Sequence, residues 1–434
     1  MPNDYSSGRR SSSGNKPPNK IPPRDANRRG ESYPPVNKIS HKKIKREPSY
    51  APARKKLYLL GHDGDIDRPF FAILLVLLVF GITMMFSASY FWAIAEEGDG
   101  YFYLKRQLMA AALGFVGMIL ISKVDYHFLQ NTKVAFIAFG AVLTLNLYTA
   151  FFGYSVAGAK RWIILLGQNF QPSEILKVTF IVIFAYLLSC NYPKFKDWRY
   201  SILPFVIVLG AVAVVLVLQR HMSAIVLVGI IGLGMMFIGG IPHKYFWRLV
   251  CVIAGAGLLL VIFKMITSTG SDSGFGYITK RIQGWRDPSS DIQGTTHQIW
   301  NSLISIGSGG VFGLGFGESK QKFLWLSESQ NDFVFAIVCE ELGLIGALFV
   351  IVLFCLFIYR GFHIASKSPD RFGMLLAAGI TIQIGIQALF NIAVATNAIP
   401  NTGISLPFFS YGGTALVIQL CEMGLLLSVS RKTS

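Results

Sequence analysis

The chain has 434 residues, of which 52% are hydrophobic and only 15% are charged. This balance lies outside the range of soluble globular proteins and predicts a membrane protein that crosses the bilayer several times. The net charge of +17 does not indicate a nucleic-acid-binding domain, because residues 1–56 alone hold 15 Lys and Arg against 4 Asp and Glu, and no nucleic-acid-binding motif accompanies them.

The N-terminal segment 1–56 is rich in Pro, Ser, Asn and Arg and has few large apolar residues. Such a composition predicts a disordered basic tail. A basic segment that precedes the first membrane span is expected on the cytoplasmic side, where it can also lie on anionic lipid.

Ten apolar segments follow the tail, each near the length of about 20 residues that a membrane-spanning helix needs. We therefore expect an all-α polytopic membrane protein with about ten transmembrane helices over residues 65–430. The expected spans are 69–89, 105–122, 133–152, 171–190, 201–218, 222–240, 244–264, 332–358, 371–394 and 406–430.

The charges in the short loops predict the orientation of these spans. Lys and Arg recur in alternate loops and at the C-terminus, whereas the first loop on the other side carries Glu96, Glu97 and Asp99. Because positive loops stay in the cytoplasm, both termini are expected there. A large loop between the seventh and eighth helices, residues 267–331, is then extracellular.

This loop is the long polar interruption in an otherwise apolar chain, and its centre reads Asp287-Pro288-Ser289-Ser290-Asp291. Long ordered loops are usually functional, which makes its aspartates candidates for catalysis. The structural alternative is that both aspartates only shape a turn, for which this sequence is well suited.

Charged residues within or beside the apolar spans need a separate explanation, because they are costly there and often functional. Glu174 and Lys177 are three residues apart on an expected helix, so they share a face and can form an ion pair. In one interpretation this pair is structural. In the other, Arg161 and Lys177 form a cationic site for a phosphorylated head group.

Glycines recur through residues 307–317, where they permit tight turns and close backbone approach, but the run lacks the Gly-Lys-Ser/Thr ending of a phosphate-binding loop. Lys320 and Lys322 follow directly and could meet an anion. Glu340 and Glu341, at the start of the eighth span, could either hold the bundle together or line a cavity.

Two further features complete the pattern. Residues 400–414 carry two prolines and three glycines at the entrance of the tenth span, which predicts broken or re-entrant backbone.

His221 and His297 are interpreted as structural. The five cysteines lie in or beside apolar runs without metal-ligand spacing, so no dedicated metal site is predicted.

The order and spacing of six motifs resemble the SEDS family of bacterial cell-wall proteins over about residues 65–430. The motifs are GAKRWI, FQPSEILK, the Asp-Pro-Ser-Ser-Asp loop, IGSGGVFGLGFGESKQKF, NDFVFAIVCEELG and PNTGISLPFFSYGGT. The resemblance implies a ten-span peptidoglycan glycosyltransferase, a hexosyltransferase that polymerises lipid II beside a class B penicillin-binding protein. It is greater to the division and sporulation branches than to the elongation branch, and division is favoured.

The resemblance also assigns residues. The family's essential aspartate matches Asp291, and polar family positions match Arg161, Glu174, Lys177 and Arg281. With Trp285, Lys320 and Lys322, these side chains are expected to bind the diphosphate or the sugars.

Two segments depart from the family pattern. Residues 219–224 read Gln-Arg-His-Met-Ser-Ala where many relatives have Gln-Pro-Asp-Leu-Gly-Thr, which removes an acid from the short hairpin between the fifth and sixth spans. Residues 326–333 lack a histidine that many relatives carry. Neither change affects Asp291.

The chemistry that these residues imply is an inverting glycosyl transfer. Asp291 would act as general base for a sugar hydroxyl, an effect typically worth 10²–10⁴-fold, and the cations would stabilise the leaving diphosphate. No cofactor is required by the sequence, although Mg²⁺ or Mn²⁺ could bridge Asp291 and the diphosphate. The alternatives are a lipid II flippase, an elongation- or sporulation-specific polymerase, and a non-catalytic division scaffold. The expected location is the bacterial plasma membrane at the division septum.

Overall fold

The computed structural model describes residues 64–156, 159–165, 168–252, 255, 276–294, 296–323, 325–326 and 329–432. The basic tail 1–56 lies outside these residues. The expected seventh span, 244–264, is described only at residues 244–252 and 255, which are helical; its other residues lie outside the described chain.

Eight helices of the described chain are long and apolar enough to cross a membrane, and they coincide with eight of the ten expected spans. The helical polytopic class is therefore confirmed. The expected sixth span is a shorter apolar helix, α7 (Met222–Ile238). The other bundle helices are α1 (Arg68–Glu97), α2 (Phe102–Lys123), α3 (Thr132–Phe152), α4 (Pro172–Asn191), α5 (Trp198–Ser201), α6 (Leu203–Leu218), α11 (Val334–Lys367), α12 (Arg371–Ala395) and α13 (Gly413–Ser430), with the short 3-10 turns η1 (Tyr126–Gln130) and η2 (Tyr192–Lys194).

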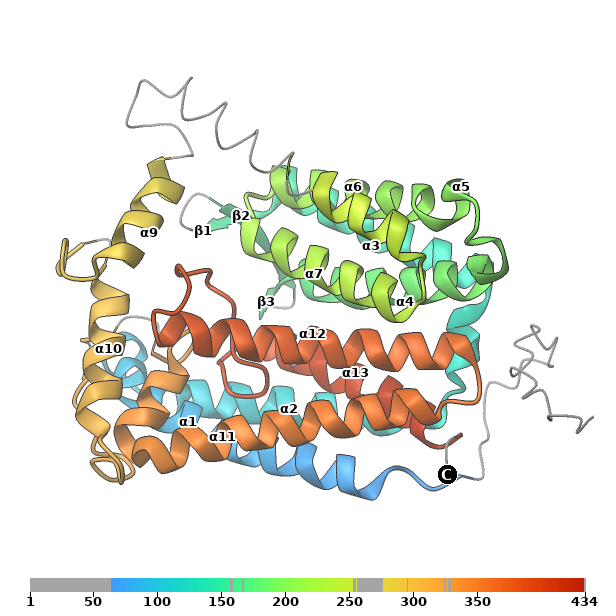
Figure 1. The fold of residues 1–434 in the computed structure, drawn as a ribbon. Helices are drawn as coiled ribbons and strands as arrows, with labels where there is room; N and C mark the ends of the chain where they lie inside the picture. The colour runs from blue at the N-terminus through green and yellow to red at the C-terminus, as the bar shows by residue number, and fades with distance from the viewer. Residues whose placement is uncertain are drawn as a thin grey trace, which may run out of the picture. The chain divides into compact units, whose positions relative to one another are not determined.

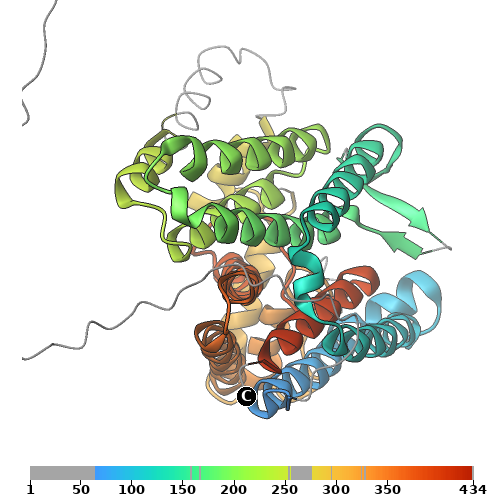
Figure 2. The same ribbon diagram turned by 90° about the vertical axis from the view of Figure 1, so that its right-hand side faces the viewer.

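The bundle helices run side by side, with α13 packed along α2, α11 along α12, and α3 along α4 (Figure 1). Two helices of the long polar loop, α9 (Gly276–Arg286) and α10 (His297–Gly309), lie across one end, which we call the loop end. The described chain starts and stops at the opposite end, which we call the terminal end and which faces the viewer in Figure 2.

A small antiparallel sheet connects α3 to α4 at the loop end, and the sequence reasoning did not predict it. Its strands are β1 (Tyr154–Val156), β2 (Ala159–Leu165) and β3 (Gln168–Phe170), in the order β1-β2-β3. Tyr154 pairs with Trp162, and Ile163 pairs with Phe170. The sheet thereby places Arg161 and Trp162 next to the start of α4.

The glycine run after α10 folds against a break in α11. Gly343 has φ 64°, which interrupts the helix, and the freed backbone groups pair with the run: Leu314 N donates to Glu340 O at 2.9 Å, and Leu344 N donates to Gly310 O at 2.9 Å. At Gly313 a Cβ would lie 2.1 Å from the Glu341 carbonyl oxygen. These glycines therefore serve close packing of two backbones.

The expected tenth span is broken at its entrance, as its prolines and glycines predict. Helix α13 begins at Gly413 rather than near residue 406, and the preceding residues form a turn in which Phe408 has φ 67°. Phe408 and Phe409 are buried in protein. This burial satisfies the condition under which irregular backbone is tolerated at membrane depth.

Candidate active site

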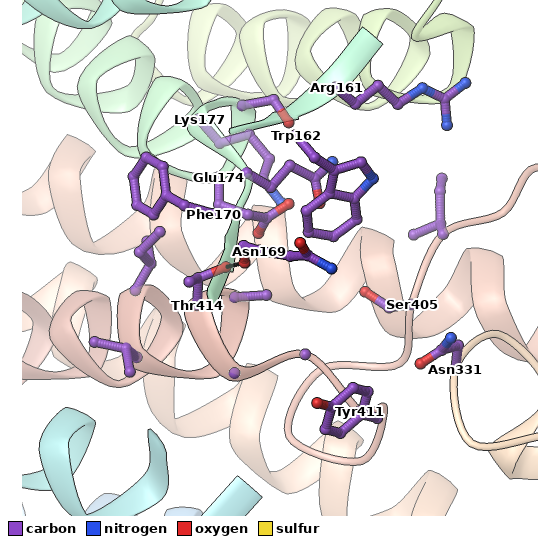
Figure 3. Close-up of a pocket in the computed structure, with 18 of the residues that line it drawn as sticks. Arg161, Trp162, Asn169, Phe170, Glu174, Lys177, Asn331, Ser405, Tyr411 and Thr414 are labelled. Atoms are coloured by element: carbon purple, nitrogen blue, oxygen red, sulfur yellow. Dashed lines mark hydrogen bonds and ion pairs between the residues drawn. The ribbon is translucent and has the colours of Figure 1, made fainter. Parts of the chain in front are cut away.

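A cavity of about 740 Å³ lies where the small sheet, the start of α4 and the turn before α13 meet (Figure 3). Its size falls within the usual range for ligand sites. Of the side chains that the sequence singled out, Arg161, Glu174 and Lys177 line it together.

Glu174 and Lys177 form the expected ion pair, with Lys177 Nζ 2.8 Å from Glu174 Oε2. Both side chains are largely buried in the cavity wall. A buried ion pair is stabilised by the hydrogen bonds of its neighbours as much as by mutual attraction.

Two further cations belong to the same wall. Arg161, on β2, donates from Nη2 to the Arg220 carbonyl oxygen at 2.8 Å, which ties the sheet to the α6–α7 turn. Arg106, on α2, lies over the Phe102 ring at 4.2 Å. With Lys177, these side chains give the cavity three positive groups from three separate elements.

Three helices begin at this cavity. The residues just before α4, α7 and α13 are Gln171, His221 and Gly412, and all three line the cavity. None of the three makes a side-chain capping bond. Because helix starts present N–H groups and the positive end of the helix dipole, they favour an anion in the cavity.

His221 is neutral at physiological pH in this wall. Burial, followed by the positive charges of Arg161 and Lys177, lowers its pKa to about 3. A neutral imidazole is a hydrogen-bonding group with one donor and one acceptor nitrogen.

The long polar loop is anchored to the segment that closes the cavity. On α9, Arg281 Nη1 donates to the Asn401 carbonyl oxygen, and Trp285 Nε1 donates to the Asn397 carbonyl oxygen at 3.1 Å. The chain continues directly from Asn401 to Gly403, which lines the cavity. The two residues expected to bind substrate thus hold the loop on the cavity rim.

Asp291 lies on the exposed turn between α9 and α10 and is not part of the cavity lining. Its carboxylate is folded against Gly294, where a Cβ would lie 2.3 Å from Oδ2. Asp287, by contrast, accepts hydrogen bonds from the backbone N and the hydroxyl of Ser289, at 3.1 and 2.6 Å. Asp287 is therefore a turn-forming residue, whereas the role of Asp291 stays a prediction.

Lys320 and Lys322 lie in a different region, which we call the Glu340–Glu341 cluster. Lys322 Nζ is 2.9 Å from Glu341 Oε1 and 3.2 Å from Ser87 Oγ, and the pair is buried. Lys320 donates its backbone N–H to Glu340 Oε1 at 2.8 Å, while its side chain is exposed. These two glutamates hold the glycine run onto the bundle, which answers the question that the sequence left open.

No group of three or more His, Cys, Asp and Glu side chains in the described residues is arranged to hold a metal ion.

A bundle of membrane-length helices with a polar cavity defines the class of a polytopic membrane protein. The model of the FtsW/RodA/SpoVE family, described as Cell cycle protein, matches residues 67–434. The chain belongs to this family, which confirms the family predicted from its motifs.

Individual relatives agree with the family match. The "Probable peptidoglycan glycosyltransferase FtsW" of Geobacter sp. (strain M18) is 36% identical over 357 residues, which cover 82% of this chain and 94% of the relative. "Stage V sporulation protein E" of Bacillus subtilis (strain 168) is 36% identical over 363 residues, with 83% and 95% covered. A solved chain described under "Structural coordination of polymerization and crosslinking by a peptidoglycan synthase complex" is similar with a TM-score of 0.70 and 25% identity, over 85% of this chain and 98% of that one.

Several cavity residues escaped the sequence reasoning. Ser173 and Gln387 are uncharged and sit in apolar helices, and His221 was interpreted as structural. Their positions at helix starts are the sequence signal that could have identified two of them. Ser173 follows the first residue of α4, and His221 directly precedes α7.

Proposed function

We propose that this protein is a peptidoglycan glycosyltransferase that polymerises lipid II into glycan strands during cell division. The names of its relatives support the reaction, and most of the first relatives are FtsW proteins, which favours division over sporulation. The observation that carries the proposal is the cavity, which is lined by three cations, by the carboxylates of Glu174 and Asp332, and by the starts of three helices. Such an arrangement suits the diphosphate of a lipid-linked sugar.

In the proposed reaction, a sugar hydroxyl of the acceptor attacks the anomeric carbon of the donor. The new bond is oxygen to anomeric carbon, and the bond to the diphosphate oxygen breaks with its electron pair going to the diphosphate. The hydroxyl proton goes to the Asp291 carboxylate. One displacement without a carboxylate nucleophile inverts the donor's α-linkage to β.

The leaving diphosphate gains negative charge as its bond to the sugar breaks. Arg161 and Lys177, together with the helix starts, are fixed before the reaction, so they stabilise this charge without rearrangement. Helix α9 is hydrogen-bonded to the 397–401 segment on the cavity rim, which supports a role for the turn that follows α9 and carries Asp291.

The proposal places the loop end outside the cell and the terminal end in the cytoplasm, in accordance with the charges of the short loops. The transpeptidase partner is proposed to be a class B penicillin-binding protein, and the location is proposed to be the septum. A divalent cation is not assigned to any residue, and no step depends on it.

The decisive experiment compares Asp291→Asn with Asp287→Asn in purified full-length protein, supplied with its transpeptidase partner and labelled lipid II in detergent. We expect glycan synthesis to fall at least about 100-fold in Asp291→Asn, because the base is lost. Asp287→Asn should keep most activity, since the amide oxygen can still accept the Ser289 hydrogen bonds. Thermal stability of both variants should match the parent, because both sites are exposed.

Full activity of Asp291→Asn would refute the role of this carboxylate. If the wild-type protein makes no polymer under any condition but moves lipid II across liposome membranes, the flippase function would replace the polymerase.

A further inference from the structure

Three uncharged polar residues, each within or next to a different helix, line the same cavity. Ser173 lies in α4, His221 precedes α7, and Gln387 lies in α12, with 3%, 8% and 3% of their surfaces exposed. Each carries a buried atom without a hydrogen-bond partner: the hydroxyl of Ser173, Nδ1 of His221 and Oε1 of Gln387.

Unpaired buried polar atoms are uncommon, because each one costs about 1–3 kcal/mol relative to a paired one. Outside the cavity, the neighbouring Gln383 is partly paired: its amide nitrogen donates to both Glu422 oxygens at 2.9 Å, while its Oε1 has no partner. Ser173, His221 and Gln387 differ from such isolated cases because all three line one cavity. Three unpaired atoms on residues that line one cavity therefore point to a ligand that supplies the missing partners.

The types of atom restrict that ligand. Oε1 of Gln387 can only accept a hydrogen bond, whereas a hydroxyl and a neutral imidazole each offer one donor and at least one acceptor position. An ionised diphosphate has acceptors only, so it leaves Gln387 unpaired. A sugar with hydroxyl and N-acetylamino groups offers both donors and acceptors and can satisfy all three side chains.

We propose that Ser173, His221 and Gln387 form a sugar-recognition surface, which binds hydroxyl or acetamido groups of the lipid-linked saccharide and selects it over the bare lipid diphosphate. This proposal rests on the proposed function, because it takes the saccharide lipid as the ligand of the cavity. It assigns a separate task to the cations Arg106, Arg161 and Lys177, which bind the diphosphate whether or not a sugar is attached.

The charges of the cavity wall agree with these separate roles for the uncharged residues and the cations. His221 is uncharged at physiological pH, so it recognises a neutral group without competing with the cations for the diphosphate. The cavity volume of about 740 Å³ leaves room for sugar and diphosphate groups together.

The test measures binding of two lipids to the full-length protein in detergent: lipid II, and undecaprenyl diphosphate, which has no sugar. The variants are Gln387→Leu and His221→Phe, which keep approximate volume but remove the polar atoms. Thr381→Val is the matched control, because Thr381 is buried in the same helix, bonds only to Ala377 O in the described structure, and lies outside the cavity lining.

We expect Gln387→Leu and His221→Phe to weaken lipid II binding about tenfold, the usual loss for one hydrogen bond of this kind. Binding of undecaprenyl diphosphate should change less than about twofold, and Thr381→Val should affect neither lipid. His221→Asn should recover part of the lipid II affinity, because its amide restores a donor and an acceptor; it also serves as the informative variant if His221→Phe does not fold.

Equal weakening of both lipids would overturn the proposal and assign the three residues to the diphosphate or to the fold. Unchanged binding of both lipids would also overturn the proposal, because it would mean that only water pairs with the polar atoms of these residues. If the wild-type protein binds neither lipid, the proposed function fails together with this proposal. If the wild-type protein binds lipid II and only the expected difference between the variants is missing, this proposal alone fails.

Discussion

The loop end of the bundle contains two polar regions that look alike in sequence but differ in how their polar groups are satisfied. In the Glu340–Glu341 cluster, Glu340 accepts hydrogen bonds from Ser305 and Ser319 at 2.6 Å, and Glu341 accepts from Ser87 at 2.7 Å and from Lys322 at 2.9 Å. In the cavity, Ser173, His221 and Gln387 keep unpaired atoms. The carboxylates of the cluster are satisfied within the fold and stabilise it, whereas the unpaired atoms of the cavity residues lack partners in the protein.

The largest effect on stability is expected from a substitution in the Glu340–Glu341 cluster. Glu341→Ala leaves Lys322 as a buried cation without its counter-charge, so we expect a loss of about 3–5 kcal/mol in unfolding free energy. Thermal unfolding of the purified protein in detergent measures this loss.

The double variant Glu341→Leu/Lys322→Met is the control, because it removes both charges and should recover most of the stability. If Glu341→Ala unfolds at the parental temperature, the cluster does not stabilise the fold and the contrast with the cavity disappears.

A smaller effect is expected from the glycines that let the cluster close. Gly313 has φ 81° and no room for a Cβ beside Glu341, whereas Gly317 has φ 84° and nothing within 4 Å of a built Cβ. Gly313→Ala should therefore cost more than about 2 kcal/mol, and Gly317→Ala only about 1 kcal/mol, which is the conformational cost alone. Denaturation of the two variants side by side checks the difference; equal losses would contradict the packing role.

The smallest expected effect concerns a third polar network, at the terminal end. Lys432 Nζ lies 2.9 Å from both Asp125 carboxylate oxygens, and His127 contacts Asp125 at 2.7 Å and Asp370 at 3.4 Å. Burial and Lys432 lower the pKa of His127, but the hydrogen bonds and charges of Asp370 and Asp125 outweigh them and raise it above its usual 6.5.

A raised pKa means that this histidine stabilises the fold below pH 6.5 and that the contribution is lost as pH rises through its folded-state pKa. We expect the melting temperature to fall by no more than about 2 °C between pH 6 and pH 8 for this reason. His127→Gln should flatten that change, since glutamine does not titrate. An unaltered pH profile in His127→Gln would show that other groups cause the decline.

The sequence alone was enough for the features that depend on local spacing. Apolar lengths predicted eight of the spans that the described chain contains, the three-residue interval predicted the Glu174–Lys177 pair, and prolines with glycines predicted the irregular entrance to α13. These features follow from residues close together in the chain, where periodicity and turn preferences act directly.

The features that depend on distant segments could not be read in the same way. Lys322 follows a glycine run that suggested an anion site, yet its partner is Glu341, brought close by the break at Gly343. The cavity arises because helix starts from residues 172, 222 and 413 meet, and nothing local to any of them indicates the others. The same limit applies to Asp291, whose assignment came from family resemblance.

The three helix starts at the cavity limit how far a point mutation can weaken the binding of an anion there. Their attraction for an anion comes from backbone N–H groups and from the summed dipoles of whole helices, which almost every amino acid supplies equally. A point mutation can delete one cationic side chain, but it cannot delete this contribution without destroying a helix. An inhibitor that carries a negative group into the cavity would therefore keep part of its binding energy against any single resistance substitution.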